Sequence, residues 1–342
     1  CAGPASTPTG APISAAKGAV EFEEPDVEYA AEVTLPALVP ANLEDGESVR
    51  IVATTNIVAD IVAQVGGDAV DLVALIPPGA DPHSFVARPK DLTALADAHV
   101  VFINGLHLEE SLEPFLADLQ GRVPVVSVNA GVGLLVLGAD GETHGGRQEE
   151  AGANLEEGAK DAQAHQETDP HTWFSLHAVE QWVKNIEHAL SEVDPANAEA
   201  YSANANRYLR KLETLDDEFD TAIAPISPAQ RKLVTDHESL GYFANEYNFE
   251  LIGTVIPSLS TMASPSASEL ARLQKQIEGE EVRAIFVGTT VNPGLAAQVA
   301  ADTGVQVVPI YTGSLSEDGG PAPTYLDFMR YNVTAIVDAL RE

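Results

Sequence analysis

Short apolar runs alternate with amphipathic segments over most of the chain. Runs rich in Val, Ile, Leu and Phe have the length and composition of buried strands, at 50–54, 70–76, 99–106, 123–128, 232–237, 249–256, 283–288 and 305–310. Between them apolar residues recur at helical spacing, at 58–67, 89–98, 175–193, 239–248, 266–279, 293–304 and 324–340. Strands that alternate with helices are typical of parallel sheets covered by helices. The pattern therefore predicts an α/β fold, in which Asn56 caps the first helix.

One helical segment is longer than the others. Asp194 stands at its cap position and Pro195 at its first helical position, which is a favourable helix start. Apolar side chains then recur every three or four residues, at Ala198, Tyr201, Ala205, Tyr208, Leu212, Leu215 and Phe219. A helix from Pro195 to about Ala224 would be roughly 45 Å long. It divides the chain into a tether (1–48), an N-terminal α/β lobe (49–193), the linking helix (194–225) and a C-terminal α/β lobe (226–342), with a cleft between the lobes.

Two acidic segments interrupt the alternation. Residues 1–48 contain nine acidic residues and one lysine, and residues 139–169 contain nine acidic residues against Arg147 and Lys160. Neither segment has a sustained apolar period, so we expect a flexible tether and a mobile surface loop. The formal charge of the whole chain is −34. This charge argues against nucleic acid as a partner, because phosphate binding needs clustered Lys and Arg; cations are the natural ligands.

The single cysteine of the chain is Cys1. One cysteine excludes an intrachain disulfide and a cysteine-based zinc knuckle. Cys-Ala-Gly followed by Pro, Ser and Thr resembles the mature end of a bacterial lipoprotein, so we expect Cys1 to carry a lipid; the alternative is that the sequence merely begins there. More than one acyl chain would hold the protein stably at a membrane surface. No apolar run approaches the roughly 20 residues of a membrane helix.

Histidines supply the candidate chemistry. The tripeptide Asp-Pro-His occurs twice, ending at His83 and His171, and proline stiffens each loop so that the imidazole leaves it in a defined direction. His237 stands at the carboxyl end of a predicted strand, where ligands of open parallel sheets bind. Neutral imidazole is a good ligand for zinc and other late divalent metals, so these three histidines predict one metal site. A structural or solvated role is expected for the others, which are His99, His107, His144, His165, His177 and His188.

A set of longer motifs points in the same direction. They are IVATTNIVADIVAQVGG, PPGADPHSFVARPKDL, INGLHLE, DPHTWFS, VTDHESLGYFANEY and SLSEDGGPAPTYLDFMRYN. As a set they resemble the extracytoplasmic metal-binding proteins of zinc and manganese ABC transporters, the cluster A-I solute-binding family. The resemblance implies two α/β lobes bridged by a rigid helix. It also implies that a metal lies between the lobes, bound by His83 and His171 from the N-terminal lobe and by His237 from the C-terminal lobe.

The metal and its fourth ligand follow from the same resemblance. Zinc-type members are similar in having histidine at the third position, whereas manganese-type members commonly have glutamate. The fourth ligand is usually an aspartate in a Tyr-Thr-Asp-Ser-like stretch, but this chain has Gly313 there, in YTGSLSED. Water, Glu317 or Asp318 would then complete the site. Three imidazoles and one light oxygen ligand favour zinc, because manganese prefers carboxylate and water oxygens.

The function that the resemblance implies is that of a receptor, not an enzyme. It would be a monomeric, lipid-anchored protein outside the cytoplasm that binds Zn2+ and passes it to the membrane permease of an ABC transporter. A receptor for Mn2+ of the same family is one alternative. A zinc hydrolase is another, since three histidines and a water also form catalytic sites and Glu238 stands beside His237 as a candidate base. A third is a surface adhesin or metal scavenger without a permease.

Overall fold

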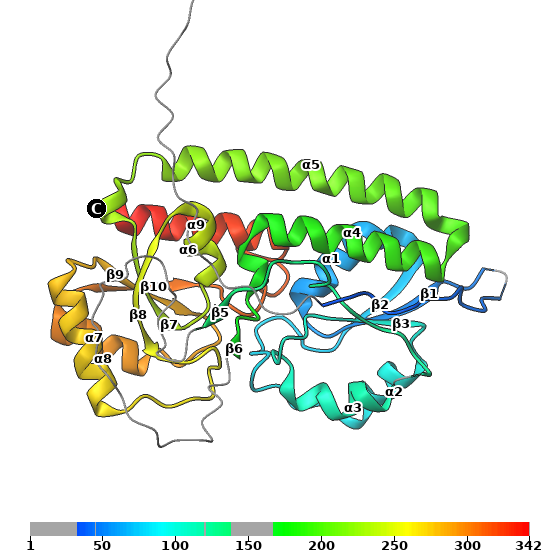
Figure 1. Cartoon of the computed structure of the whole chain (residues 1–342), viewed down its shortest axis with the longest axis horizontal. Coiled ribbons are helices and arrows are strands. Elements are labelled where there is room, and N and C mark those ends of the chain that lie inside the picture. Colours follow the sequence, from blue (N-terminus) through cyan, green and yellow to red (C-terminus); the bar gives the residue numbers. More distant parts are fainter. Residues whose placement is uncertain (1–32, 45, 120, 138–166, 342) are drawn as a thin grey trace, which may run out of the picture.

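The computed structural model describes residues 33–44, 46–119, 121–137 and 167–341. It has the predicted architecture, with two α/β lobes and a long helix that runs along both (Figure 1). Each lobe contains a four-stranded parallel sheet. The N-terminal sheet has the order β2-β1-β3-β4, with β1 at Val49–Ala53, β2 at Val70–Ala74, β3 at Val100–Ile103 and β4 at Val125–Ser127. The C-terminal sheet has the order β8-β7-β9-β10, with β7 at Lys232–His237, β8 at Glu250–Ile256, β9 at Ala284–Gly288 and β10 at Gln306–Ile310.

The helices cover these sheets largely where the apolar spacing predicts them. Their bounds are α1 Asn56–Gly66, α2 Pro89–Asp97, α3 Glu113–Asp118, α4 Leu176–Val193, α5 Ala198–Ile223, α6 Gly241–Tyr247, α7 Ala267–Gly279, α8 Gly294–Thr303 and α9 Tyr325–Arg341. Helix α3 has no predicted counterpart, because its six residues are too few to show a helical period. In the part of the chain that the structure describes, no helix is both long enough and apolar enough to cross a bilayer.

Helix α5 is the predicted linking rod. It packs on α1 and α4 of the N-terminal lobe and on α9 of the C-terminal lobe (Figure 1). Its buried residues follow the predicted stripe, at Tyr201, Ala205, Tyr208, Leu212, Leu215, Phe219 and Ile223. The helix begins at Ala198, after a 3-10 turn at Pro195–Asn197. Asp194 does not cap it, because its Oδ2 accepts hydrogen bonds from the side chains of Asn197 and Tyr201.

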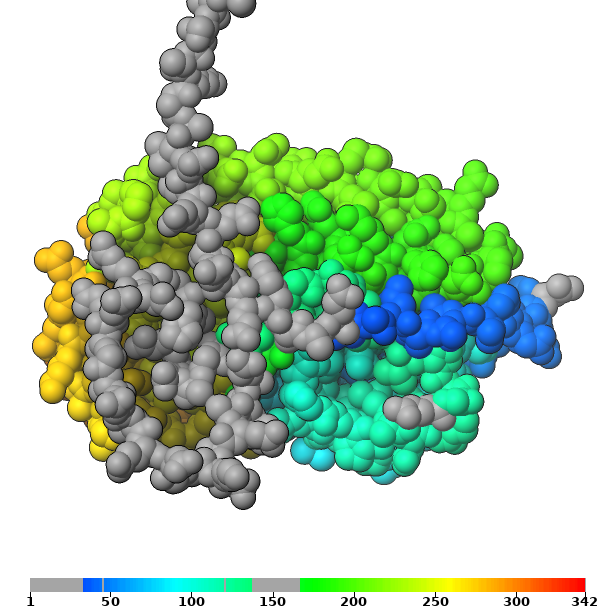
Figure 2. Space-filling view, viewed as in Figure 1, coloured from blue at the N-terminus to red at the C-terminus, as the bar shows by residue number. Residues whose placement is uncertain are grey.

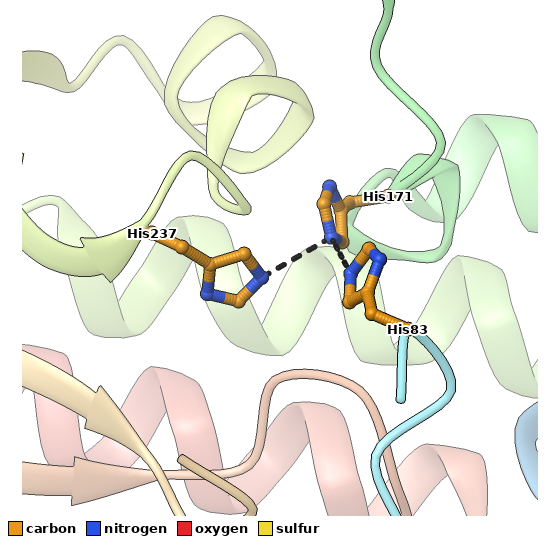
Figure 3. Close-up of side chains that lie close together, drawn as sticks. All are labelled: His83, His171 and His237. Carbon is orange, nitrogen blue, oxygen red and sulfur yellow. Dashed lines mark hydrogen bonds between the residues drawn. The ribbon is translucent and has the colours of Figure 1, made fainter. Parts of the chain in front are cut away.

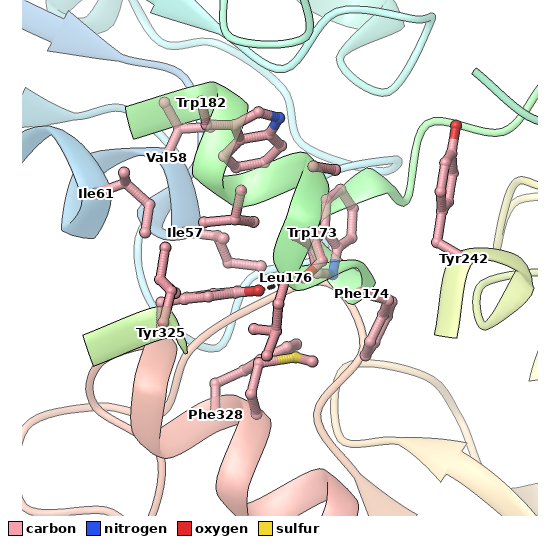
Figure 4. Close-up of a cluster of buried hydrophobic side chains, with 14 of the residues drawn as sticks. Ile57, Val58, Ile61, Trp173, Phe174, Leu176, Trp182, Tyr242, Tyr325 and Phe328 are labelled. Carbon is pink, nitrogen blue, oxygen red and sulfur yellow. Dashed lines mark hydrogen bonds between the residues drawn. The ribbon is translucent and has the colours of Figure 1, made fainter. Parts of the chain in front are cut away.

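A continuous hydrophobic core joins the two lobes. Figure 4 shows Ile57 of helix α1 near Trp173, Phe174, Tyr325 and Phe328, all of which are buried. The rings of Phe174 and Phe328 lie with their centroids 5.6 Å apart, and the Tyr325 hydroxyl donates to the Trp173 carbonyl at 2.7 Å. Since Trp173 and Phe174 stand two and three residues after His171, this core fixes the chain just after that histidine.

The expectation of a flexible tether over residues 1–48 is wrong for its last part. Residues 33–44 run along the surface of the N-terminal lobe, and Figure 2 shows them in blue below helix α4. Apolar side chains pack against the core at Val33, Leu35, Leu38, Ala41 and Leu43. The segment is also pinned by backbone hydrogen bonds, from Gly131 to the Val33 carbonyl and from Ala41 to the Val193 carbonyl. Their spacing follows neither a helix nor a strand, so no period revealed them. Residues 1–32 lie outside the described residues.

The expected mobile loop at 139–169 is also shorter than predicted. Its last residues form strand β6 (Glu167–Thr168), which pairs antiparallel with β5 (Val136–Leu137). Asp169 is buried at 4% exposure, and its carboxylate accepts hydrogen bonds from His171, two residues later. The remainder of the predicted loop, with His144 and His165, lies outside the described residues.

Asn56 does not cap the first helix. The cap is Thr55, whose Oγ1 accepts a hydrogen bond from Val58 N. The Asn56 side chain instead reaches Ser314 and Leu315 in the C-terminal lobe. A residue predicted to have a local role thus connects the two lobes.

Candidate metal centre

The structure brings together the three histidines that the sequence singles out. His83 lies in the loop after β2, His171 precedes the turn that leads into α4, and His237 ends β7. The Nε2 atom of His171 lies 3.3 Å from that of His83 and 3.3 Å from that of His237. One ring nitrogen of each histidine lies within 4.8 Å of the others. Figure 3 shows His237 facing the other two rings across the junction of the lobes.

The repeated Asp-Pro-His motif forms the same turn twice. In each copy the aspartate Oδ1 accepts the backbone N–H of the histidine two residues later, at 3.1 Å for His83 and 2.9 Å for His171. This hydrogen bond is an Asx-turn, and the intervening proline pre-sets its backbone. The motif therefore aims both imidazoles by local chemistry.

The two copies differ in what else the aspartate holds. Asp169 Oδ1 also accepts from His171 Nδ1, at 2.8 Å. In the first copy Asp81 uses its other oxygen to accept from Thr261 Oγ1 of the C-terminal lobe, at 2.6 Å. No residue within the described ranges is hydrogen-bonded to the Nδ1 of His83. The orientation of His83 therefore depends on its loop, not on a carboxylate at its ring.

His237 has a carboxylate partner of its own. Asp236 Oδ1 accepts from the ring Nδ1 of His237 at 2.8 Å, and its Oδ2 accepts from Gly288 N at 2.7 Å. Gly288 allows this approach because a methyl group there would lie only 2.9 Å from Asp236 Oδ2. Carboxylates bound to Nδ1 fix the tautomer of a metal-binding histidine and leave the Nε2 lone pair for the ion. His171 and His237 therefore both present Nε2 to the centre of the group.

Burial controls the protonation of the group. It lowers the pKa of His83 to about 3, helped by the two neighbouring imidazoles, and holds the pKa of His171 well below its usual value. Burial also acts to lower the pKa of His237, but the Asp236 carboxylate outweighs it and the net shift is upward. Burial raises the pKa of Asp169 to about 7. Neutral imidazoles at His83 and His171 keep their lone pairs free for a cation.

The other sequence candidates lie apart from this group. Glu317 and Asp318 are exposed, and Glu238 is not among the side chains whose ligand atoms converge in the described part of the chain. His107 and His177 are exposed and pair with Glu113 and Glu246. His99 has a structural role, because it accepts a hydrogen bond from Arg50 N. His188 is solvent-exposed on α4.

Sequence reasoning overlooked one supporting residue. Asp236 precedes His237 directly in TDHE, and its carboxylate holds that ring as Asp169 holds the ring of His171. The signal was present, since an aspartate stands one or two positions before each of the three histidines.

Two parallel α/β lobes joined by a long helix, with three convergent imidazoles between them, define a metal-binding solute-binding protein. The chain belongs to the family described as zinc-uptake complex component A, periplasmic, which it matches over residues 51–339. It is thus an extracytoplasmic, metal-binding component of an ABC transporter and not an enzyme.

Some of the similar proteins are named for manganese and others for zinc. The manganese-binding lipoprotein MntA of Halalkalibacterium halodurans is 30% identical over 300 residues, covering 87% of this chain and 91% of the relative. The manganese transporter lipoprotein PsaA of Streptococcus mitis is 28% identical over 303 residues, covering 86% and 90%. Among solved structures, the Mn-bound periplasmic metal-binding protein from candidatus Liberibacter asiaticus has a TM-score of 0.72 at 28% identity, covering 86% of this chain and all of that one. The periplasmic zinc-binding protein TroA of Treponema pallidum also has a TM-score of 0.72, with coverage of 86% and 99%, but its 24% identity shows the fold alone.

Proposed function

We propose that the protein binds one zinc ion through His83, His171 and His237 and delivers it to the permease of an ABC transporter. The observation that carries this proposal is the convergence of three imidazoles, two of them held by buried aspartates. Water is the simplest fourth ligand, because Glu317 and Asp318 are exposed and Gly313 has no side chain to offer.

Two of the three nitrogen spacings fit a single bound ion such as zinc. Zinc–nitrogen bonds of ~2.05 Å at tetrahedral angles place neighbouring ligand nitrogens about 3.3 Å apart. The Nε2 atom of His171 lies at 3.3 Å from each of the other two Nε2 atoms. A site with three imidazoles also binds zinc above manganese in the Irving–Williams order.

Manganese is the second candidate, and the curated relatives support it better than zinc. The relatives MntA and PsaA are named for manganese, whereas the family description names zinc. A manganese site would need oxygen ligands beside the imidazoles. Asp169 and Asp236 each hold a ring Nδ1 atom through Oδ1, so water is the simplest source of these oxygens.

The same proposal includes membrane attachment through Cys1. The relatives MntA and PsaA are lipoproteins by name. Cys1 lies outside the described residues, so the support is the names of these relatives. Mass spectrometry of Cys1 in protein taken from its native membrane tests this attachment.

Competition decides between the metals. Chelator-stripped protein is titrated with zinc and with manganese against a fluorescent chelator, and native mass spectrometry counts the bound ions. The expected result is one ion per chain and zinc binding tighter than manganese by orders of magnitude. Tighter manganese binding would select the second candidate.

A further inference from the structure

A short segment of the C-terminal lobe contacts both loops that carry the N-terminal histidines. This segment, residues 312–315 between β10 and α9, is named the strap here. It contains Gly313, the position at which the family resemblance expects a fourth ligand. Thr312, Ser314 and Leu315 are buried, so the strap lies inside the junction of the lobes and not on its surface.

On one side the strap holds the segment that follows His171. Trp173 Nε1 donates a hydrogen bond to the Thr312 carbonyl at 2.9 Å. The Trp173 ring lies edge-on to the His171 ring, with centroids 5.2 Å apart. The strap thus fixes the aromatic side chain against which this imidazole rests.

On the other side the strap holds the loop that leads to His83. Ser314 Oγ accepts hydrogen bonds from Gly79 N at 2.8 Å and from Asn56 Nδ2 at 3.0 Å. Asn56 Oδ1 in turn accepts from Leu315 N at 2.8 Å. The Asn56 amide and the Ser314 hydroxyl are both buried, so the two hydrogen bonds between Asn56 and the strap form away from competing water.

Between these two contacts the strap touches the His83 loop directly. A methyl group at Gly313 would lie 3.0 Å from Pro82 Cδ, so the strap backbone passes close to the residue before His83. Outside the strap, Thr261 adds one more link from the C-terminal lobe to this loop, through Asp81. Of the three histidines of the site, His83 is the one whose ring has no carboxylate partner among the described residues. Its loop is linked to the opposite lobe through Gly79 and Asp81.

We propose that Ser314, Asn56 and Thr261 are positioning residues that hold the His83 loop at the metal across the junction of the lobes. The strap acts by holding the two histidine loops through hydrogen bonds, at a point of the fold where it supplies no ligand side chain. Loss of these contacts then releases His83 first. The inference rests on the proposed role of His83 as a ligand.

The test compares two serines of neighbouring position. Ser314→Ala removes the acceptor of Gly79 N and Asn56 Nδ2. Ser316→Ala is the matched control, because Ser316 Oγ bonds only Glu317 O and Ala322 N of its own lobe in the described structure. Zinc-loaded proteins are mixed with excess chelator in a stopped-flow instrument, and hydrogen exchange is followed in the peptide that spans residues 77–85.

Ser314→Ala is expected to release zinc about tenfold faster, since it loses the buried hydrogen bond from Asn56 Nδ2 and the part-buried one from Gly79 N. In the 77–85 peptide, amide hydrogens other than that of Gly79 should also exchange faster. Ser316→Ala should change the release rate by less than about twofold. Thr261→Val, which removes only the link to Asp81, should release zinc about fivefold faster and serves as the test if Ser314→Ala does not fold.

Release from Ser314→Ala or Thr261→Val at the rate of the control would overturn the inference. His83→Ala separates this failure from failure of the proposed function. If His83→Ala binds zinc much more weakly while Ser314→Ala and Thr261→Val release it normally, only the positioning role is lost. If His83→Ala binds zinc as tightly as the unaltered protein, the site assignment and this inference both fall.

Discussion

The two lobes share one strand order but use it differently. In each lobe the first strand lies between the second and third, and the fourth lies at the edge. The first strand of the C-terminal lobe ends in Asp236 and His237, a ligand candidate with its own carboxylate. The first strand of the N-terminal lobe is followed by Thr55, which caps helix α1, and by Asn56, which binds the opposite lobe.

The loops after the second strands show the same division. In the N-terminal lobe this loop carries His83, and in the C-terminal lobe it carries Thr261, which holds the aspartate of the His83 loop. Equivalent places in two similar sheets therefore supply a ligand in one lobe and a support for that ligand in the other. One half of the site is built from local turns, and the other half depends on contact between the lobes.

The largest effect should come from removing a ligand of either lobe. His171→Ala and His237→Ala are each expected to weaken zinc binding by more than about a hundredfold. Each variant replaces one of the three proposed imidazole ligands by water, which binds zinc more weakly. Isothermal titration against a competing chelator measures the loss. His188→Ala, on the exposed face of α4, is the control and should bind normally. Near-native affinity in either ligand variant would remove that histidine from the site.

A smaller effect is expected at the carboxylates. Asp169→Asn and Asp236→Asn should each weaken zinc binding by about 10- to 100-fold, the usual range for the partner of a metal-binding histidine. Asp236→Asn should cost more, because Asp236 also accepts the N–H of Gly288. Asp97→Asn, at the end of the outlying helix α2, provides the matched control. Equal and unchanged affinities would show that the two rings need no carboxylate.

The sequence carried most of this structure because most of its determinants are local. Strands, helices and the Asp-Pro-His turns depend on residues within a few positions of each other, and they were predicted with small shifts at their ends. The role of Asn56 was missed because its partner Ser314 is 258 residues away. The packed segment at 33–44 was missed because its apolar side chains pack against the core at irregular spacing. Contacts between the lobes join residues far apart in the sequence, so they produce no regular residue spacing from which they could be predicted.

A still smaller effect should follow from the strap glycine. Gly313→Ala places a methyl group 3.0 Å from Pro82 Cδ, so the His83 loop must shift by a few tenths of an ångström. Zinc affinity is expected to fall by about threefold, since a ligand displaced slightly keeps most of its bond. Gly304→Ala cannot serve as the control because its φ of 78° strains any side chain, but Gly279→Ala can, since nothing lies within 4 Å of its added carbon. A loss of a hundredfold or more would mean that Gly313 itself lies in the ion's coordination sphere.

The smallest effect should come from the insertion that only the N-terminal lobe carries between its last strand and α4. Leu137 and Glu167 are paired across β5 and β6, so residues 138–166 can be replaced by an Asn-Gly turn, which suits a tight hairpin. Zinc affinity should stay within about twofold, because the three histidines and both aspartates lie outside the replaced part. Extending the deletion through residue 169 should instead weaken binding by at least tenfold, since it removes the carboxylate that holds His171. Chelator competition on the two variants measures the contrast. If the short replacement already abolished tight binding, the insertion would have to supply a ligand, and the site would not be the one formed by His83, His171 and His237.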